Sequence, residues 1–337
     1  MADGVSVVAR NWQRALEQLG FEVCTVAGEG PVDRTVPGLA IGATSPAATD
    51  AAGLTGEVHE ALADADLVVV ENLCTIPLNL PAARAVAEVL AGRPAVLHHH
   101  DPPWQRARWA HITELPPHDP AWRHVTINRL TRAQMHDRGF DATCIYNGFP
   151  VDTGHADRAG VRQRLGIGDD DLLLAHPVRA IPRKDVPTAV RMAEELGGTY
   201  WLWGPAEDGY DAELRRILAN ARCPVIEGTN GEGAADLYGA ADAVLYPSTW
   251  EGFGNPPVEA AIHRRPAAVG PYPVARELAG LGLRWYPTTE VESIRAAIDR
   301  PDPQRLEHNR RVAVEHLSLD TMRRRIAALL DDAGWLA

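Results

Sequence analysis

The sequence predicts an α/β protein made of two doubly wound domains, and three observations lead to that prediction. At 337 residues the chain is long for one hydrophobic core and comfortable for two. Short apolar runs suited to buried strands alternate with segments of helical hydrophobic spacing, and the alternation restarts near residue 150. This alternation is typical of parallel sheets covered by helices on both faces, with ligands at the carboxyl ends of the strands.

The composition is that of a soluble globular protein and disfavours several kinds of partner. Hydrophobic residues make up 45% of the chain and charged residues 23%. No apolar run could span a bilayer and no secretory segment opens the chain, so we expect a cytoplasmic protein without stable membrane insertion. The formal charge of -12 would repel nucleic acid or an anionic membrane. The cysteines form no Cys-x-x-Cys, which favours buried free thiols over a disulfide or zinc site; they are Cys24, Cys74, Cys144 and Cys223.

The first half of the chain begins with a helix. Apolar residues from Val5 to Leu19 fall at helical spacing, and Gly20 ends the run. A doubly wound domain normally has a central strand before this helix, so we expect a missing N-terminal piece, unless the fold manages without that strand. Residues 29–56 are rich in Gly, Pro, Ala and Thr and are predicted to form a loop. The expected strands are 21–27, 67–71, 94–98, 124–127 and 143–146, and the expected helices are 57–63, 81–91 and 129–138.

The second half repeats this architecture without repeating the sequence. Its last helix, about 320–333, has an apolar face. The other expected helices are 186–196, 211–221, 233–240, 256–264, 290–299 and 303–316. The expected strands are 172–178, 199–203, 224–227, 243–246, 267–270 and 283–286.

The most informative stretch joins the strand 243–246 to the helix that follows it. Gly252 and Gly254 flank Phe253 and permit backbone geometry that a side chain would forbid. Asn255 is predicted to cap the helix, because a proline occupies the first helical position after it. Loop amides and a helix N-terminus at the edge of a sheet form a site that favours phosphate.

Two carboxylates lie in this stretch, Glu251 in the loop and Glu259 one turn into the helix. Beside a phosphate site these carboxylates cannot serve to attract the negatively charged ligand, but they can accept hydrogen bonds from its hydroxyls. A nucleotide-sugar carries both a diphosphate and hydroxyls. The stretch therefore indicates a nucleotide-sugar site, with an ordinary capped surface helix as the alternative.

Glu251-x7-Glu259 enclosing Gly-Phe-Gly-Asn-Pro-Pro resembles the signature of retaining glycosyltransferases of family 4. The resemblance covers nearly the whole chain and implies the GT-B fold, in which two Rossmann-like doubly wound domains face each other across a cleft. It implies an acceptor-side domain over 1–150, a nucleotide-sugar-binding domain over 151–317, and a C-terminal helix within 318–337 that crosses back to the first domain. A cap on the second domain is the alternative for that helix.

Basic residues after the strand 172–178 extend the resemblance. Arg179 and Lys184 resemble the Arg and Lys that hold the donor diphosphate in this family. Fixed cations stabilise the charge that develops as the diphosphate departs, so they would replace a metal, and no metal or other cofactor is expected. Arg183 competes for the guanidinium role, and surface ion pairing is the alternative for all three. Asp169-Asp170-Asp171 has the spacing of a metal motif but is predicted to be a solvated turn.

Three consecutive histidines end the strand 94–98. On an extended strand His98 and His100 lie on one face and His99 on the other. The resemblance implies a strand-end histidine that contacts the transferred sugar; His100, followed by Asp101, is the first choice and His98 the second. There are two alternatives. One is a metal site like that of amidohydrolases, and the other is that the histidines only form hydrogen bonds with backbone groups at the sheet edge.

Two further features concern substrates. Gly4 lies in Asp3-Gly4-Val5, which resembles the Gly-Gly-Val turn of the family, and its N–H would face the diphosphate. Trp104, Trp109 and Trp122 could stack on an acceptor sugar, although core packing is the commoner fate of tryptophan.

Together these features predict a metal-independent retaining glycosyltransferase, hexosyl or pentosyl, that moves a sugar from a nucleoside-diphosphate donor to a hydroxyl of a small-molecule or oligosaccharide acceptor. The resemblance implies front-side displacement, with Glu251 on the sugar hydroxyls and Glu259 on the ribose. It also suggests a bacterial secondary-metabolite pathway such as antibiotic biosynthesis. A nucleotide-sugar epimerase and a non-catalytic sugar-nucleotide-binding protein are the alternatives.

Overall fold

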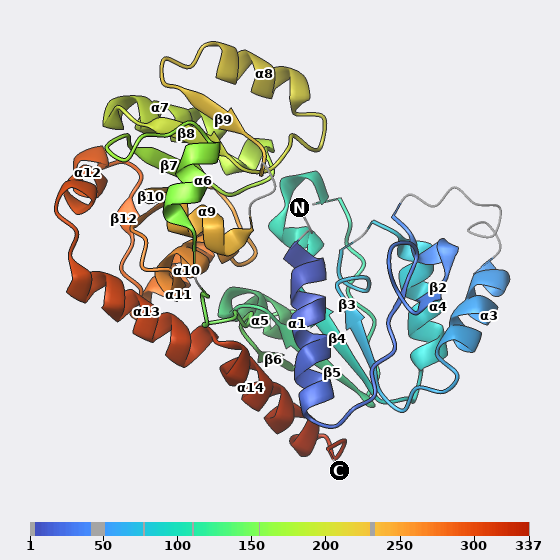
Figure 1. Ribbon diagram of the computed structural model, residues 1–337. Coiled ribbons are helices and arrows are strands. Elements are labelled where there is room, and N and C mark those ends of the chain that lie inside the picture. Colours follow the sequence, from blue (N-terminus) through green and yellow to red (C-terminus); the bar gives the residue numbers. More distant parts are fainter. Residues whose placement is uncertain are drawn as a thin grey trace. The chain divides into compact units, whose positions relative to one another are not determined.

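The computed structural model divides the chain into two compact units, each with its own parallel sheet (Figure 1). It describes residues 4–41, 51–76, 78–109, 111–154, 156–229 and 233–336. One unit runs from Phe149 to Thr321, and the other combines the residues up to Gly148 with those from Met322 on. In the described ranges, no helix is both long enough and apolar enough to cross a membrane.

The unit 149–321 contains a parallel sheet of six strands in the order β12-β11-β10-β7-β8-β9. The chain leaves β7 toward β9 on one side and leaves β10 toward β12 on the other, so β7 and β10 flank the switch point at which ligands bind in such sheets. All residues of β7, β8 and β10 are buried, as in strands covered on both faces. The strands are β7 (Leu173–His176), β8 (Thr199–Leu202), β9 (Val225–Glu227), β10 (Ala243–Tyr246), β11 (Ala267–Val269) and β12 (Tyr286–Pro287).

Local sequence signals mark both ends of the helix α7. The helix α7 begins where the Asp185 carboxylate accepts a hydrogen bond from the Thr188 N–H, and it ends at Gly197 in the left-handed conformation. The sequence did not predict α6 and α11, because a helix of seven residues, about two turns, is too short to show a helical period. The helices are α6 (Arg158–Arg164), η4 (Pro182–Lys184), α7 (Val186–Leu196), α8 (Asp211–Ala219), α9 (Ala234–Ala240), α10 (Asn255–Ile262), α11 (Pro273–Ala279), α12 (Val291–Asp299) and α13 (Pro303–Leu317).

The other unit contains a parallel sheet whose four strands follow the chain order β3-β4-β5-β6. The strands are β3 (Val68–Glu71), β4 (Ala95–His99), β5 (Trp122–Thr126) and β6 (Ala142–Cys144), with a separate pair β1 (Val26–Ala27) and β2 (Arg34–Thr35). The helices are α1 (Gly4–Gln18), η1 (Pro37–Leu39), α3 (Ala51–Ala61), α4 (Leu80–Leu90), η2 (Pro103–Gln105), η3 (Ala107–Trp109) and α5 (Arg129–His136). Contacts join α3 to α4, which lie side by side in Figure 1.

Two expectations for this unit need correction. The strand expected over 21–27 is reduced to Val26–Ala27, because only the two residues of β2 pair with it. The loop expected over 29–56 contains β2 and the first turns of α3, while residues 42–50 lie outside the described part of the chain.

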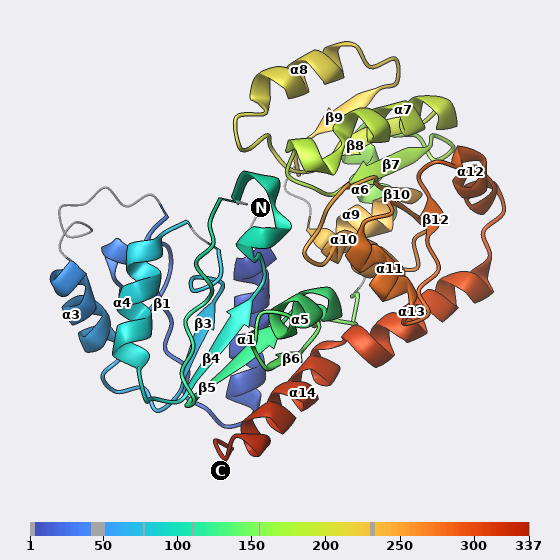
Figure 2. The same cartoon turned by 180° about the vertical axis from the view of Figure 1, so that it is seen from behind.

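The final helix, α14 (Leu319–Asp332), joins the unit of β3–β6 from Met322 on. Its apolar face is buried, and the Arg325 guanidinium lies 5.3 Å from the centre of the Tyr146 ring, two residues beyond β6. Beyond the helix, the Arg123 guanidinium of β5 lies 5.4 Å from the Trp335 ring. Figure 2 shows α14 beside α5 and β6. The buried residues are Met322, Ile326, Leu329 and Leu330.

The cysteines and the acidic run are ordinary features. All four cysteines are free thiols, but only Cys74 is buried and Cys24 is exposed, so the expectation of burial holds for Cys74 alone. The run 169–171 is exposed, and the Asp171 carboxylate accepts a hydrogen bond from the Gly168 N–H at 2.8 Å, which makes it a solvated turn.

Candidate functional site

The loops that follow β7 and β10 meet at the switch point of the six-stranded sheet. Lys184 Nζ lies 2.6 Å from Glu251 Oε1, and Arg183 Nη1 lies 2.5 Å from Glu251 Oε2. Arg183 also donates to the Trp250 carbonyl at 2.8 Å, and its own carbonyl accepts from the Thr249 N–H at 2.9 Å. These contacts tie the two loops together around one carboxylate.

This cluster carries surplus positive charge. Burial opposes the ionisation of Glu251, but the charges of Lys184 and Arg183 outweigh it and lower the pKa of Glu251 to about 2. Burial lowers the pKa of Lys184 to about 8, against the attraction of Glu251. At neutral pH two cations therefore surround one carboxylate, in a chain whose formal charge is -12. Such a local surplus suits a doubly charged anion such as a diphosphate.

Arg179 lies outside this cluster. Its Nη1 is 2.7 Å from Glu207 Oε2, and the two side chains are 31% and 39% exposed. Exposed ion pairs are weak, so the Arg179 guanidinium could leave Glu207 at little cost when an anion arrives. The structure therefore brings Arg183 and Lys184 to Glu251, and leaves Arg179 in the partly exposed ion pair that the sequence analysis kept as an alternative.

The turn into α10 requires glycine at position 254. Gly254 has φ 99, and a Cβ there would lie 2.0 Å from the hydroxyl oxygen of Tyr272. Gly254 is the N-cap and Asn255 the first helical residue, so the helix begins one residue before its predicted start. The predicted capping role of Asn255 is therefore wrong, because the N-cap position is occupied by Gly254. The N-terminus of a helix is a place at which a phosphate can accept hydrogen bonds from backbone amides.

Phe253, Gly252 and Glu259 belong to the same glycine-bearing motif, and each has its own surroundings. Phe253 is 4% exposed and its ring centre lies 6.1 Å from that of Phe149, so it anchors the loop. Gly252 is half-buried. The Tyr238 hydroxyl donates to Glu259 Oε2 at 2.5 Å, while Oε1 makes no hydrogen bond with the described residues. Burial raises the pKa of Glu259.

In the other unit, Glu71 organises the histidines at the end of β4. Glu71 is the register partner of His98 in the adjacent strand. Its Oε2 lies 2.9 Å from His98 Nδ1 and 2.9 Å from His100 Nε2. His99 lies on the opposite face, with Nδ1 2.6 Å from the Thr75 hydroxyl, as strand alternation predicts.

Asn72, the next residue, holds the backbone at the same place. It has φ 61, in the left-handed region, and its Oδ1 accepts hydrogen bonds from the N–H groups of His100 and Asp101, both at 3.1 Å. The Asp101 carboxylate in turn pairs with Arg106. Glu71 and Asn72 were not predicted as site residues, although a polar pair directly after the apolar run 67–70 was a usable signal.

The Glu71 cluster has the donor set of a metal site. Glu71, His98 and His100 each offer one ligand atom within 4.8 Å of the others, and transition metals bind such sets. No second group of this kind occurs among the described residues, so the further ligands of a binuclear amidohydrolase site are not found there. Burial opposes ionisation of Glu71, but His98 and His100 lower its pKa to about 2.

The other predicted substrate contacts in this unit are dispersed. Gly4 opens α1 and is exposed, while Asp3 lies outside the described residues. Trp122 is 5% exposed and its Nε1 donates to the Leu90 carbonyl, so it belongs to the core. Trp104 donates to Gln134 and stacks under Arg138, and Trp109 is half-buried.

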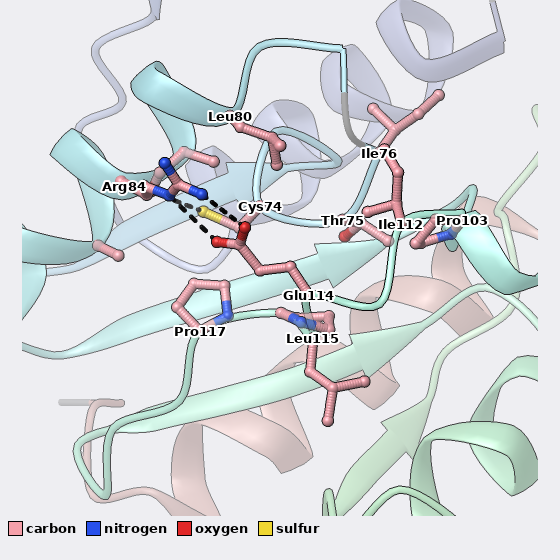
Figure 3. A pocket seen from close by; sticks show the side chains of 13 residues that line it. Cys74, Thr75, Ile76, Leu80, Arg84, Pro103, Ile112, Glu114, Leu115 and Pro117 are labelled. Carbon is pink, nitrogen blue, oxygen red and sulfur yellow. Dashed lines mark hydrogen bonds and ion pairs between the residues drawn. The ribbon is translucent and has the colours of Figure 1, made fainter. Parts of the chain in front are cut away.

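A small pocket of about 120 Å³ lies between α4 and the segment 112–117 (Figure 3). Arg84 and Glu114 form its charged side, with Nη2 2.6 Å from Oε2. Apart from these two and Thr75, side chains without charge or hydroxyl line it, and none of the predicted site residues does. The lining is Cys74, Thr75, Ile76, Leu80, Ala83, Arg84, Ala87, Pro103, Ile112, Glu114, Leu115, Pro116 and Pro117.

Comparisons with known proteins agree with this architecture. No family model matches the chain. It is 34% identical over 171 residues to the D-inositol 3-phosphate glycosyltransferase of Mycobacteroides abscessus, a match that covers 48% of this chain and 38% of the relative. It is 23% identical over 270 residues to the mannosylglucosylglycerate synthase of Petrotoga mobilis, covering 65% and 63%. The chain thus spans under two thirds of the length of either curated relative.

A structural likeness extends over nearly the whole chain. The crystal structure of Anabaena HepE in complex with UDP and glucose matches with a TM-score of 0.69 and 18% identity, covering 98% of this chain and 96% of that one. Both units of this chain, each an α/β unit with a parallel sheet, fall within that match. The chain therefore has the GT-B fold predicted from its sequence.

Proposed function

We propose that this protein is a glycosyltransferase that transfers a sugar from a nucleoside-diphosphate donor to an acceptor hydroxyl. The observation that carries the proposal is the convergence of Lys184 and Arg183 on Glu251 at the switch point of a GT-B sheet. The names of the curated relatives and the UDP and glucose of the HepE complex support the same class of reaction and donor.

In this proposal the unit 149–321 binds the donor. Lys184 and the guanidinium of Arg179, released from Glu207, hold the diphosphate, whose charge grows as its bond to the sugar breaks. The loop amides from Gly252 to Asn255 assist them. Glu251 accepts hydrogen bonds from the sugar hydroxyls, and the free Oε1 of Glu259 accepts from the ribose.

We further propose a retaining, metal-independent reaction. The acceptor oxygen forms its bond to the anomeric carbon on the face from which the diphosphate leaves, and the acceptor proton passes to a departing phosphate oxygen. Lysine and arginine supply the charge stabilisation that a divalent ion supplies elsewhere. The unit that contains β3–β6 is assigned to the acceptor, with His100 as the contact to the transferred sugar.

The test separates transfer from the alternative functions. A panel of nucleotide-sugars is screened by thermal shift, since a donor present at a hundred times its Kd adds about 2.7 kcal/mol of stability. Donors that bind are then incubated with and without hydroxyl acceptors. Release of nucleoside diphosphate that depends on the acceptor supports the proposal, whereas interconversion of the donor alone would indicate an epimerase. Binding without either reaction would indicate a binding protein.

Glu251 provides the residue-level test. Glu251→Gln should lower the transfer rate by about a hundred-fold, because the amide loses a charge-assisted acceptor, and should change nucleotide affinity little. Glu292→Gln, an 89% exposed glutamate of α12, is the matched control and should leave the rate unchanged. Unchanged turnover of Glu251→Gln would refute the role assigned to Glu251.

A further inference from the structure

We propose that Glu71 is a positioning residue, which fixes the imidazole of His100 in the tautomer protonated at Nε2 and leaves Nδ1 as a hydrogen-bond acceptor for a sugar hydroxyl. The identity of the ligand rests on the proposed function. The tautomer does not, since it follows from contacts within the unit of β3–β6.

The Glu71 carboxylate determines which ring nitrogens of its two histidines carry a hydrogen. Even with the ordinary pKa of a glutamate, the Glu71 carboxylate is ionised at neutral pH, and an ionised carboxylate can only accept hydrogen bonds. Both ring nitrogens that lie 2.9 Å from its Oε2 must therefore carry the hydrogen, namely His98 Nδ1 and His100 Nε2. In its neutral form the His100 imidazole holds one N–H, which the contact with Glu71 places at Nε2, so that Nδ1 keeps a lone pair. It makes no hydrogen bond with the described residues.

The two histidines differ in what remains open to a ligand. The His98 side chain is fully buried, its Nε2 has no partner, and the Trp12 ring covers it at a centroid distance of 4.4 Å. The His100 side chain is 5% exposed. Its Nδ1, unlike Nε2 of His98, is not a fully buried atom without a partner. His98 is therefore closed to a ligand, and His100 is the histidine that can meet one.

Several contacts hold this geometry in place. The register places Glu71 opposite His98, and Asn72 holds the backbone N–H groups of His100 and Asp101. The ring of His100 can thus turn only by giving up its bond to Glu71. A side chain fixed in this way presents its acceptor without losing further freedom when substrate binds.

The test reads the tautomer directly. Long-range 15N–1H NMR correlations of the protein distinguish Nε2–H from Nδ1–H rings, and the His100 signals are identified by their loss in His100→Gln. We expect His100 to be protonated at Nε2 in the unaltered protein. Glu71→Gln should retain this tautomer, because its amide oxygen can accept in place of Oε2. Glu71→Met has a side chain of similar size but no hydrogen-bond acceptor, so in this variant His100 should no longer be held in the tautomer protonated at Nε2.

Activity gives the second readout. Glu71→Met should lower kcat by about ten-fold, the effect of one lost hydrogen bond, with a smaller change in the donor KM, and Glu71→Gln should recover most of the loss. Thr75→Val is the matched control, since it removes a buried hydrogen bond to His99 and should leave the His100 tautomer unchanged.

Three results would overturn the proposal. The first is a His100 ring protonated at Nδ1 in the unaltered protein, a result that needs no variant to fold. The second is a stoichiometric transition metal in the purified protein, because ligation requires unprotonated nitrogens. The third is an equal loss of activity in Glu71→Gln and Glu71→Met. Both variants lack the negative charge of Glu71, so this result would attribute the loss to the charge and not to the hydrogen bond. If the expected NMR pattern appears without any transfer activity, the positioning role stands and the proposed function fails.

Discussion

The carboxylate of Glu251 has two tasks at different stages of the proposed reaction. In the structure described here its two oxygens are occupied by Lys184 and Arg183. A diphosphate would compete with Glu251 for Lys184, and the ammonium that turns toward it would free Oε1 of the carboxylate for a sugar hydroxyl. Binding of the diphosphate would thus prepare Glu251 to accept hydrogen bonds from the sugar. One side chain would in this way couple the binding of the two parts of the donor.

The two arginines of this loop should behave differently when removed. Arg179→Ala should weaken UDP binding about ten-fold or more, because the partly exposed guanidinium can leave Glu207 to pair with phosphate, and should leave Tm nearly unchanged. Arg183→Ala should instead lower Tm, because Arg183 joins the Trp250 carbonyl and Glu251. Titration calorimetry and thermal melts measure the two effects, and each variant serves as the control for the other. A larger loss of affinity in Arg183→Ala would transfer the diphosphate role to Arg183.

Lys184 should make nucleotide binding depend on alkaline pH. Its pKa of about 8 means that it is charged below that pH and loses its proton as the pH rises through it. UDP affinity should therefore fall by about ten-fold between pH 7 and pH 9.5, the effect of one lost charged contact. Lys184→Arg, whose guanidinium stays charged, should bind UDP with little change over this range. An identical alkaline decline in both proteins, measured by calorimetry, would exclude Lys184 as its cause.

At the scale of elements, the sequence predicted the bounds of strands and helices better than it predicted the side-chain contacts of the candidate site. The strand β10 and the helix α7 have the predicted bounds, because a short apolar run and a capped helix with a terminal glycine are local signals. The Glu71 cluster depends instead on the register of β3 and β4, which joins residues 27 positions apart. The choice between Arg179 and Arg183 at Glu251 likewise depends on the direction of the η4 turn, which residue types alone do not define.

The turn between β10 and α10 offers a test at this scale. Gly254→Ala should destabilise the protein by about 2 to 4 kcal/mol, since alanine is strained at φ 99 and its Cβ would meet the Tyr272 hydroxyl oxygen at 2.0 Å. Adding Tyr272→Phe should recover part of this loss by removing the hydroxyl, but not the part due to backbone strain. Denaturant unfolding of the two single variants and the double variant measures the coupling. Strictly additive losses would show that the contact with Tyr272 does not matter.

At the scale of the whole molecule, α14 should be required for the unit of β3–β6. Ile326 is fully buried, so Ile326→Ala should cost about 2 to 5 kcal/mol in the stability of this unit. Hydrogen exchange read by peptide should accelerate in β4 and β5 and remain unchanged in β7 and β8. Asp331→Ala, an exposed position near the end of the same helix, should have little effect. Faster exchange in β7 and β8 instead would show that α14 stabilises the unit 149–321.

The pairing of residues up to Gly148 with those from Met322 on also has a consequence for biosynthesis. The ribosome releases the chain from its N-terminal end, so the segment up to Gly148 emerges long before the last helix of its own unit. Until then, the surface that later receives Ile326 and Leu330 is an open apolar patch on a nascent chain. This patch is where a chaperone would be expected to bind during translation.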